Sequence, residues 1–238
     1  MASDRIFQAW VNPLAFLDVD EPWASVDKQQ PNLDAVVGFL CPPGTAADVE
    51  SLIARYKEIS TEPVRLFAAP ADPRILEKLV WPLRHAKGSY MVGNYLAVIA
   101  LCGMVAEMLA VLAWELGEAT LRGNAMSAAD ERALFGSAFE RLGQERRVQV
   151  LGAYGMIDAT ARGRFDTVRE IRRKYLHVWS QDHDDLPNDA KACFHAAVAL
   201  VTTTIGQDIK EGKIVLNPQL IKYLERRGVC GPAESDAV

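Results

Sequence analysis

The sequence is poor in cysteine, histidine and net positive charge. It contains 4 Cys and 4 His in 238 residues, and 26 Lys and Arg stand against 31 Asp and Glu, for a net charge of −5. An acidic chain is a poor candidate for a broad, sequence-blind coat on nucleic acid, because contacts with phosphates need positive charge. Net charge does not exclude a local basic stripe.

The cysteines are scattered, and none of them forms a C-x-x-C pair. This spacing argues against zinc-ribbon and thioredoxin-like redox motifs. The N-terminus, MASDRIFQAWVNP, lacks a basic segment followed by an apolar one, so we predict no signal peptide. We expect a cytoplasmic protein with reduced thiols. The cysteines are Cys41, Cys102, Cys193 and Cys230.

Metal and nucleotide motifs are also missing. No G-x-G-x-x-G or P-loop pattern follows the first apolar run, so the sequence predicts no nucleotide site there. Three of the histidines show no ligand spacing with one another, and we expect no metal and no cofactor. These histidines are His85, His183 and His195.

One apolar run, Leu96–Leu116, is long enough to span a bilayer. Glu107 lies near its middle, where a lone carboxylate is costly in lipid. A helix that is apolar on every side is equally typical of the centre of a soluble bundle. We favour the bundle interpretation and expect no membrane association.

The pattern of apolar residues, caps and turn residues predicts a mainly α protein in three parts. Residues 1–88 form a small N-terminal region, irregular or mixed α/β, and 89–210 form an antiparallel helical bundle. Residues 211–238 form a short helix and a tail. The expected strands are 36–40 and 64–68, and the expected helices are 46–59, 72–85, 89–122, 127–154, 158–179, 189–210 and 218–227.

Helix 158–179 carries the most informative segment. Its apolar residues recur at steps of three or four and predict a single buried face, and Arg172 falls at the edge of that face. A guanidinium there needs an anionic partner, and Glu107 needs a cation. We predict that the two side chains pair across the bundle; the alternative is that each extends separately to water. The apolar residues are Phe165, Val168, Ile171, Tyr175 and Trp179.

His177 is the histidine best placed for chemistry. Imidazole exchanges protons near neutral pH, as general acid–base catalysis requires. The alternative is a helix-end histidine that bonds a carbonyl group or Asp182. Together Arg172 and His177 read R-x4-H, in the segment RRKYLH, at the end of a helix and before an acidic loop.

This segment resembles the HEPN family, helical domains of higher eukaryotes and prokaryotes named for nucleotide binding. The family signature is an Arg, four to six residues, and then a His near the end of a bundle helix. The helix that carries Glu107 is similar to an early bundle helix of that family, and the resemblance covers residues 89–210. It implies a homodimer that acts as a metal-independent ribonuclease or binds RNA, and it leaves any protein partner of the antitoxin type unidentified.

The resemblance implies that Arg172 and His177 are catalytic, with Glu107 and Arg173 in support. Arg173 stands where the family commonly has a small polar residue. Five residues along an unbroken helix place Arg172 and His177 about 140° apart. They can meet only if the helix ends before His177, or if two copies meet at a two-fold axis. Arg173 and His177 share a face.

Basic residues are dense around the motif. Arg162, Arg169 and Arg173 are expected to share one face that could meet phosphates. The alternative is a solvated helix face with ion pairs to Asp166 and Glu170. A non-catalytic helical dimerisation or interaction protein therefore stands beside the ribonuclease as the alternative function.

Overall fold

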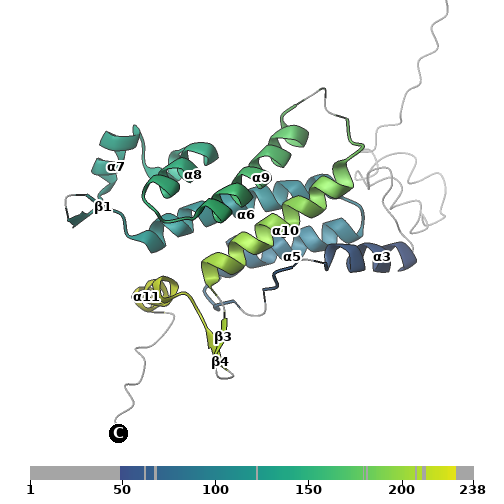
Figure 1. Ribbon diagram of the computed structural model, residues 1–238, viewed down its shortest axis with the longest axis horizontal. Coiled ribbons are helices and arrows are strands. Elements are labelled where there is room, and N and C mark those ends of the chain that lie inside the picture. The colour runs from purple at the N-terminus through teal and green to yellow at the C-terminus, as the bar shows by residue number, and fades with distance from the viewer. Residues whose placement is uncertain are drawn as a thin grey trace, which may run out of the picture.

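The computed structural model describes a mainly helical protein, as the sequence predicts (Figure 1). It describes residues 49–61, 63–66, 69–121, 123–178, 180, 182–206, 208–210 and 213–228. Two antiparallel β-hairpins supply the described strands, β1 with β2 and β3 with β4. The expected strand at 36–40 lies outside the described residues, and residues 64–66 form no strand.

The elements follow one another with short connections. The helices are α3 (Val49–Ile59), α4 (Pro73–Ile75), the π-helix η2 (Leu76–Val80), α5 (Trp81–Met91), α6 (Tyr95–Gly117), α7 (Ala128–Phe135), the 3-10 helix η3 (Phe139–Arg141), α8 (Gln144–Ala153), α9 (Ala159–Leu176), α10 (Leu186–Ile205) and α11 (Pro218–Arg226). The strands are β1 (Thr120–Leu121), β2 (Asn124–Ala125), β3 (Asp208–Lys210) and β4 (Lys213–Val215).

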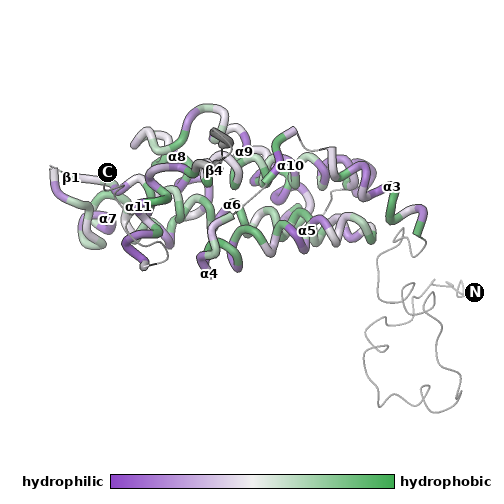
Figure 2. The backbone as a smooth tube through the Cα atoms, turned by 90° about the horizontal axis from the view of Figure 1, so that it is seen from below, coloured by the Kyte–Doolittle hydropathy of each residue, from purple (hydrophilic) through white to green (hydrophobic). Residues whose placement is uncertain are grey.

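Helix α6 is the centre of a bundle with α5, α9 and α10, which lie beside it (Figure 1). Hydrophobic residues follow α6 along its length (Figure 2). Val98 and Leu109 of α6 are fully buried, together with Phe165 of α9 and Leu200 of α10. The expected boundary at residue 88 lies inside α5, whose Tyr90 belongs to the same core.

Helix α6 passes the length and composition test for a membrane span. Half of its most apolar 18-residue stretch is nevertheless buried inside the protein. Core helices of soluble proteins pass the same test. Its apolar character is therefore accounted for, over that half, by packing within the bundle.

The apolar helix expected over 89–122 is shorter than predicted at both ends. Gly93 adopts φ 82° between α5 and α6, and the Asn94 side chain then caps α6 by accepting from the Ala97 amide at 3.3 Å. The helix ends at Gly117 with Glu118 in the left-handed conformation. Gly123, which directly follows the expected helix 89–122, turns the β1–β2 hairpin with φ 83°.

The helix that begins after Asp72 runs further than predicted, through η2 and α5 to Met91. Pro82 lacks an amide proton, so it cannot donate to a carbonyl group one turn earlier. It lies in the first turn of α5, directly after the π-helical residues Leu76–Val80. A change in hydrogen-bond register next to a proline is one way in which a helix continues past it.

Helix α3 is present, but the predicted burial of its apolar residues is wrong. The spacing within the expected helix 46–59 predicts a buried stripe of Val49, Leu52, Ile53 and Tyr56. Leu52 is half-buried, but the other three are 68%, 48% and 50% exposed in that order. Ile59, at the other end of the helix, is fully buried. The helix therefore packs into the core through its C-terminal end (Figure 1).

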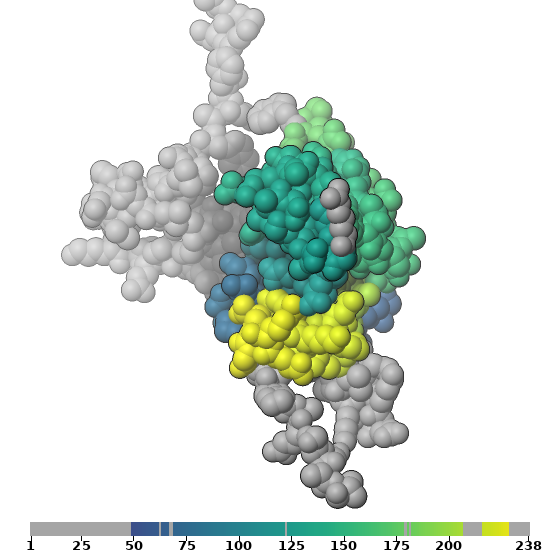
Figure 3. Space-filling model, turned by 90° about the vertical axis from the view of Figure 1, so that its left-hand side faces the viewer, coloured from purple at the N-terminus to yellow at the C-terminus, as the bar shows by residue number. Residues whose placement is uncertain are grey.

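The C-terminal part differs from a simple helix and tail. Helix α10 ends at Ile205, and β3 begins at Asp208, where the prediction continued the helix to residue 210. Helix α11 then returns to the bundle, and Figure 3 shows it (yellow) against the teal middle of the chain. Asp72 fixes this return: it is fully buried and accepts from Arg227 Nε at 2.9 Å.

Candidate functional site

Helix α9 presents the predicted site residues, and its own sequence determines where it begins and ends. The Asp158 side chain caps the first turn by accepting from the Ala161 amide at 2.7 Å. Phe165, Val168 and Tyr175 are buried, which confirms the predicted apolar face at these positions. Trp179 lies outside the described residues. The regular helix stops at Leu176, one residue before His177.

The predicted pair between α6 and α9 is confirmed. Arg172 donates from one terminal nitrogen to Oε1 of Glu107, across 65 positions of sequence. Each side chain is 30% exposed, so the pair lies at the edge of the core rather than within it. Water therefore reaches the guanidinium on one side, and a second anion could approach it there.

A second guanidinium lies at the same point of α6. Arg147 of α8 donates to the backbone carbonyl of Glu107 at 3.3 Å and to that of Glu140 at 2.6 Å. Arg147 is only 9% exposed, and within the described residues it pairs with no carboxylate. Arg147, Arg172 and Glu107 together carry one excess positive charge, which favours an anion nearby.

His177 forms the C-cap of α9 and points to the solvent side. Its backbone has left the helical conformation, with φ −131° and ψ −7°, and its amide donates to the Arg173 carbonyl at 3.2 Å. The residue is exposed. Among the described residues its ring has no hydrogen-bond partner, so the expected alternative of a bond to Asp182 or to a carbonyl group is not found there.

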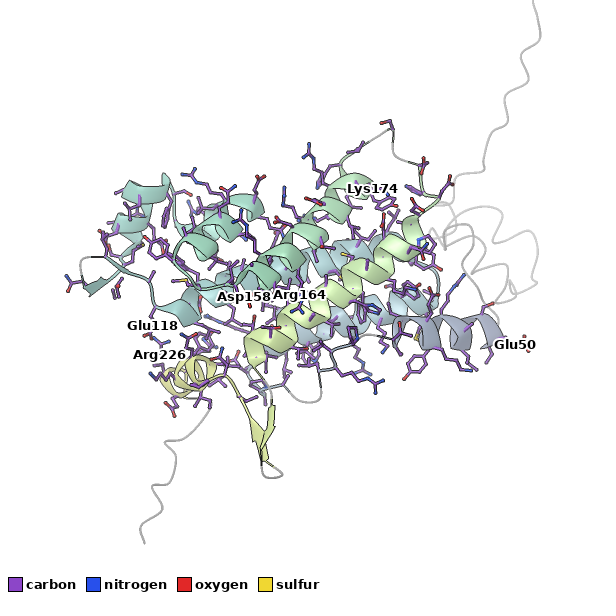
Figure 4. All side chains as sticks on the ribbon, in the orientation of Figure 1. Glu50, Glu118, Asp158, Arg164, Lys174 and Arg226 are labelled. Carbon is purple, nitrogen blue, oxygen red and sulfur yellow. The ribbon has the colours of Figure 1, made fainter. Side chains whose placement is uncertain are left out.

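The end of α9 is clamped to the start of α10. Asp189 accepts from Lys174 Nζ and from the Tyr175 hydroxyl, each at 2.8 Å (Lys174 is labelled in Figure 4). The hydrogen bond to Asp189 raises the pKa of Lys174, and burial followed by the same carboxylate raises the pKa of Tyr175. The ring of Tyr175 meets that of His183 edge-on at 5.8 Å. These contacts fix the backbone immediately before His177.

Of the basic stripe predicted on α9 (Arg162, Arg169 and Arg173), Arg169 is neutralised by carboxylates. Arg169 pairs with Glu145 and Asp166, each at 3.3 Å, and with Glu170 at 3.8 Å, as the ion-pair alternative predicted. Arg164 donates to the Thr203 hydroxyl instead.

Two basic residues of α9 remain without partners. Within the part of the chain that the structure describes, Arg162 and Arg173 make no hydrogen bond or ion pair through their side chains. Both are exposed. They are the two cations of the stripe that can meet phosphates without giving up an internal partner.

The structure brings together some of the predicted site residues and not others. Glu107 and Arg172 are in contact, whereas no hydrogen bond joins Arg172 to His177 among the described residues. The helix does end before His177, which was the condition for the two to meet within one chain. No cluster of metal-ligating side chains occurs in the described residues.

Cavities lie elsewhere, between α6, η3 and α11. One of about 620 Å³ and one of about 330 Å³ are both lined by Val111, Glu115 and Glu140. The larger also contacts Glu118 and Arg226, which pair at 2.5 Å (Figure 4). Neither of these two cavities is lined by Arg172 or His177.

Sequence reasoning missed three residues that shape the site: Arg147, Asp189 and Gly103. Arg147 and Asp189 carry no local signal, because their partners are distant in sequence. Gly103 does carry one, since a glycine inside a long apolar helix often marks a close approach. Comparison with protein-family models, curated proteins and solved structures finds no match for this chain.

Proposed function

We propose that this chain is a HEPN-like RNA-binding protein that cleaves RNA without a metal, as a homodimer. One observation carries the proposal. Glu107 anchors Arg172 at a partly exposed position of α9, while five residues later His177 leaves the helix and is exposed. A positioned guanidinium and an accessible imidazole are the groups that phosphodiester transesterification requires.

In this proposal His177 takes the proton from a ribose 2′-hydroxyl. The 2′-oxygen then forms a bond to phosphorus, and the bond from phosphorus to the 5′-oxygen breaks. Water protonates the departing oxygen, so each site needs one His177. Arg172 stabilises the negative charge on the phosphorane oxygens, with Arg173 available beside it. The products carry a 2′,3′-cyclic phosphate and a 5′-hydroxyl.

The test compares four proteins on end-labelled RNA in excess EDTA: wild type, Arg172→Ala, His177→Ala and the control Arg84→Ala. Arg84 is an exposed arginine of α5, outside the basic residues of α9. We expect wild type and the control to cleave, and the two site variants to lose about 100-fold or more in rate. Equal cleavage by all four, or none by any, would overturn the proposal.

The homodimer is tested separately by mixing Arg172→Ala with His177→Ala. If each site takes Arg172 from one copy and His177 from the other, a mixed dimer holds one intact site. Activity should then return on mixing, while each variant alone stays inactive. No recovery, with an active wild type, would place both residues of a site in the same chain.

A second candidate function is a non-catalytic helical interaction protein, and the Glu107–Arg172 pair is the observation that favours it. The guanidinium already has an anionic partner, so it can serve the fold alone. In that case Arg172→Ala lowers stability, and His177→Ala changes neither stability nor any effect on RNA. Sedimentation of wild type with and without RNA separates the two candidates.

A further inference from the structure

Gly103 lies on α6 one turn before Glu107, at the point where the Arg172 side chain crosses the helix. It is buried. A Cβ atom added at Gly103 would lie 2.5 Å from Cδ of Arg172, 3.1 Å from its Nε and 3.5 Å from its Cγ. The first distance is far below the 3.5–4.0 Å at which carbon atoms pack. The missing side chain is therefore the space that Arg172 fills.

One other helical glycine, Gly117 at the end of α6, also has a close neighbour, the Met156 side chain, but three helical glycines have none. Around Gly88 of α5, Gly152 of α8 and Gly163 of α9, an added Cβ would meet nothing within 4 Å. A glycine inside a helix destabilises it relative to alanine. At Gly103 the absence of a side chain offsets this loss of helix stability, because it lets the Arg172 side chain pack against the backbone of α6.

We propose that Gly103 is a positioning residue for Arg172: it holds the arginine stem against α6 so that the guanidinium reaches Glu107 and keeps one side toward solvent. The inference rests on the proposed function for its catalytic consequence. Its structural part does not depend on any reaction: the space above Gly103 holds the Arg172 side chain, and we call this space the seat.

The geometry predicts that a side chain at position 103 would displace Arg172. Gly103 and Glu107 are four residues apart and therefore lie on one face of α6. The arginine stem crosses the first and its guanidinium reaches the second. Even a methyl group at position 103 would lift the stem away from α6, and with it the guanidinium from the Glu107 carboxylate.

The test is a double-mutant cycle of Gly103→Ala and Arg172→Ala, with Gly163→Ala as the matched control. In the Arg172→Ala background nothing occupies the seat, so Gly103→Ala should raise Tm by about 2 °C, as helix propensity predicts. With Arg172 present the same change should not raise Tm. Gly163→Ala should raise Tm equally in both backgrounds. An equal rise in Tm for Gly103→Ala in both backgrounds would overturn the proposal that Gly103 makes room for Arg172.

Cleavage of labelled RNA adds the catalytic readout. Displacing the guanidinium should lower kcat about 100-fold in Gly103→Ala, with little change in Gly163→Ala. If the cycle shows coupling but Gly103→Ala cleaves at the wild-type rate, the positioning role is overturned and only packing remains. If wild type cleaves nothing, the proposed function fails, and the Tm cycle alone decides whether Gly103 seats Arg172.

Discussion

Two of the arginine–carboxylate pairs that join distant parts of this chain differ in the burial of their carboxylates. Asp72 is fully buried where Arg227 reaches it from the end of α11, while Glu107 and Arg172 are each 30% exposed. A buried carboxylate with all its contacts internal serves the fold. The two arginine side chains are similarly exposed, 28% for Arg227 and 30% for Arg172. The carboxylates therefore make the difference: one is enclosed by the fold, and the other is partly open to water, as a candidate functional pair requires.

The largest expected effect is at the structural pair. Asp72→Ala removes the N-cap of α4, which accepts from the Ile75 amide at 3.1 Å, and leaves Arg227 without its carboxylate. We expect the free energy of unfolding to fall by about 3 kcal/mol in urea titrations. Asp158→Ala, which removes a cap without an arginine partner, should cost about 1 kcal/mol. Equal losses would remove the distinction.

The same pair should respond to acid. Burial raises the pKa of Asp72, but hydrogen bonds from Arg227 and the Ile75 amide outweigh it, so the pKa lies below its usual value. The pair therefore stabilises the fold fully above about pH 4, the unfolded value, and this contribution is lost as the pH falls through the folded value. Wild type and Asp72→Asn should differ in stability at pH 7 and converge at lower pH. A constant difference would contradict the assignment.

Much of this comparison could not be predicted from the sequence. Periodicity and turn signals located the helices expected from residues 72, 127 and 158, because these signals are local. In the structure Asp72, Ser127 and Asp158 are the N-caps there. The Glu107–Arg172 pair was predictable because both charges interrupt apolar faces.

The partners of other residues depend on how distant segments meet. Arg227 and Asp72 are 155 positions apart, and no local pattern links them. The apolar residues of α3 followed a helical period yet are exposed, since periodicity cannot tell whether a neighbour covers that face. For the same reason, the sequence could not determine whether the side chains of Arg172 and His177 meet.

A smaller effect is expected at the functional pair. Glu107→Gln keeps the shape of the side chain but removes the charge, and partial exposure limits the loss to about 1 kcal/mol. Binding of labelled RNA, followed by fluorescence anisotropy, should not weaken, because Arg172 loses a competing anion. If Glu107→Gln lost as much stability as Asp72→Ala, the Glu107–Arg172 pair would be a structural pair like Asp72–Arg227.

The smallest effect on stability is expected at His177. Its side chain is exposed and has no hydrogen-bond partner among the described residues, so His177→Ala should change the free energy of unfolding by no more than about 0.5 kcal/mol. Thermal unfolding followed by circular dichroism measures this. A larger loss would mean that His177 supports the end of α9.

The most direct test of the central claim is the chemistry of the RNA ends. Wild type and His177→Ala, matched in Tm, are incubated with end-labelled RNA in excess EDTA, and the 3′ ends of the products are identified. The proposed mechanism predicts 2′,3′-cyclic phosphate ends from wild type and none from His177→Ala. Products with 3′-hydroxyl ends, or equal product from both proteins, would contradict it.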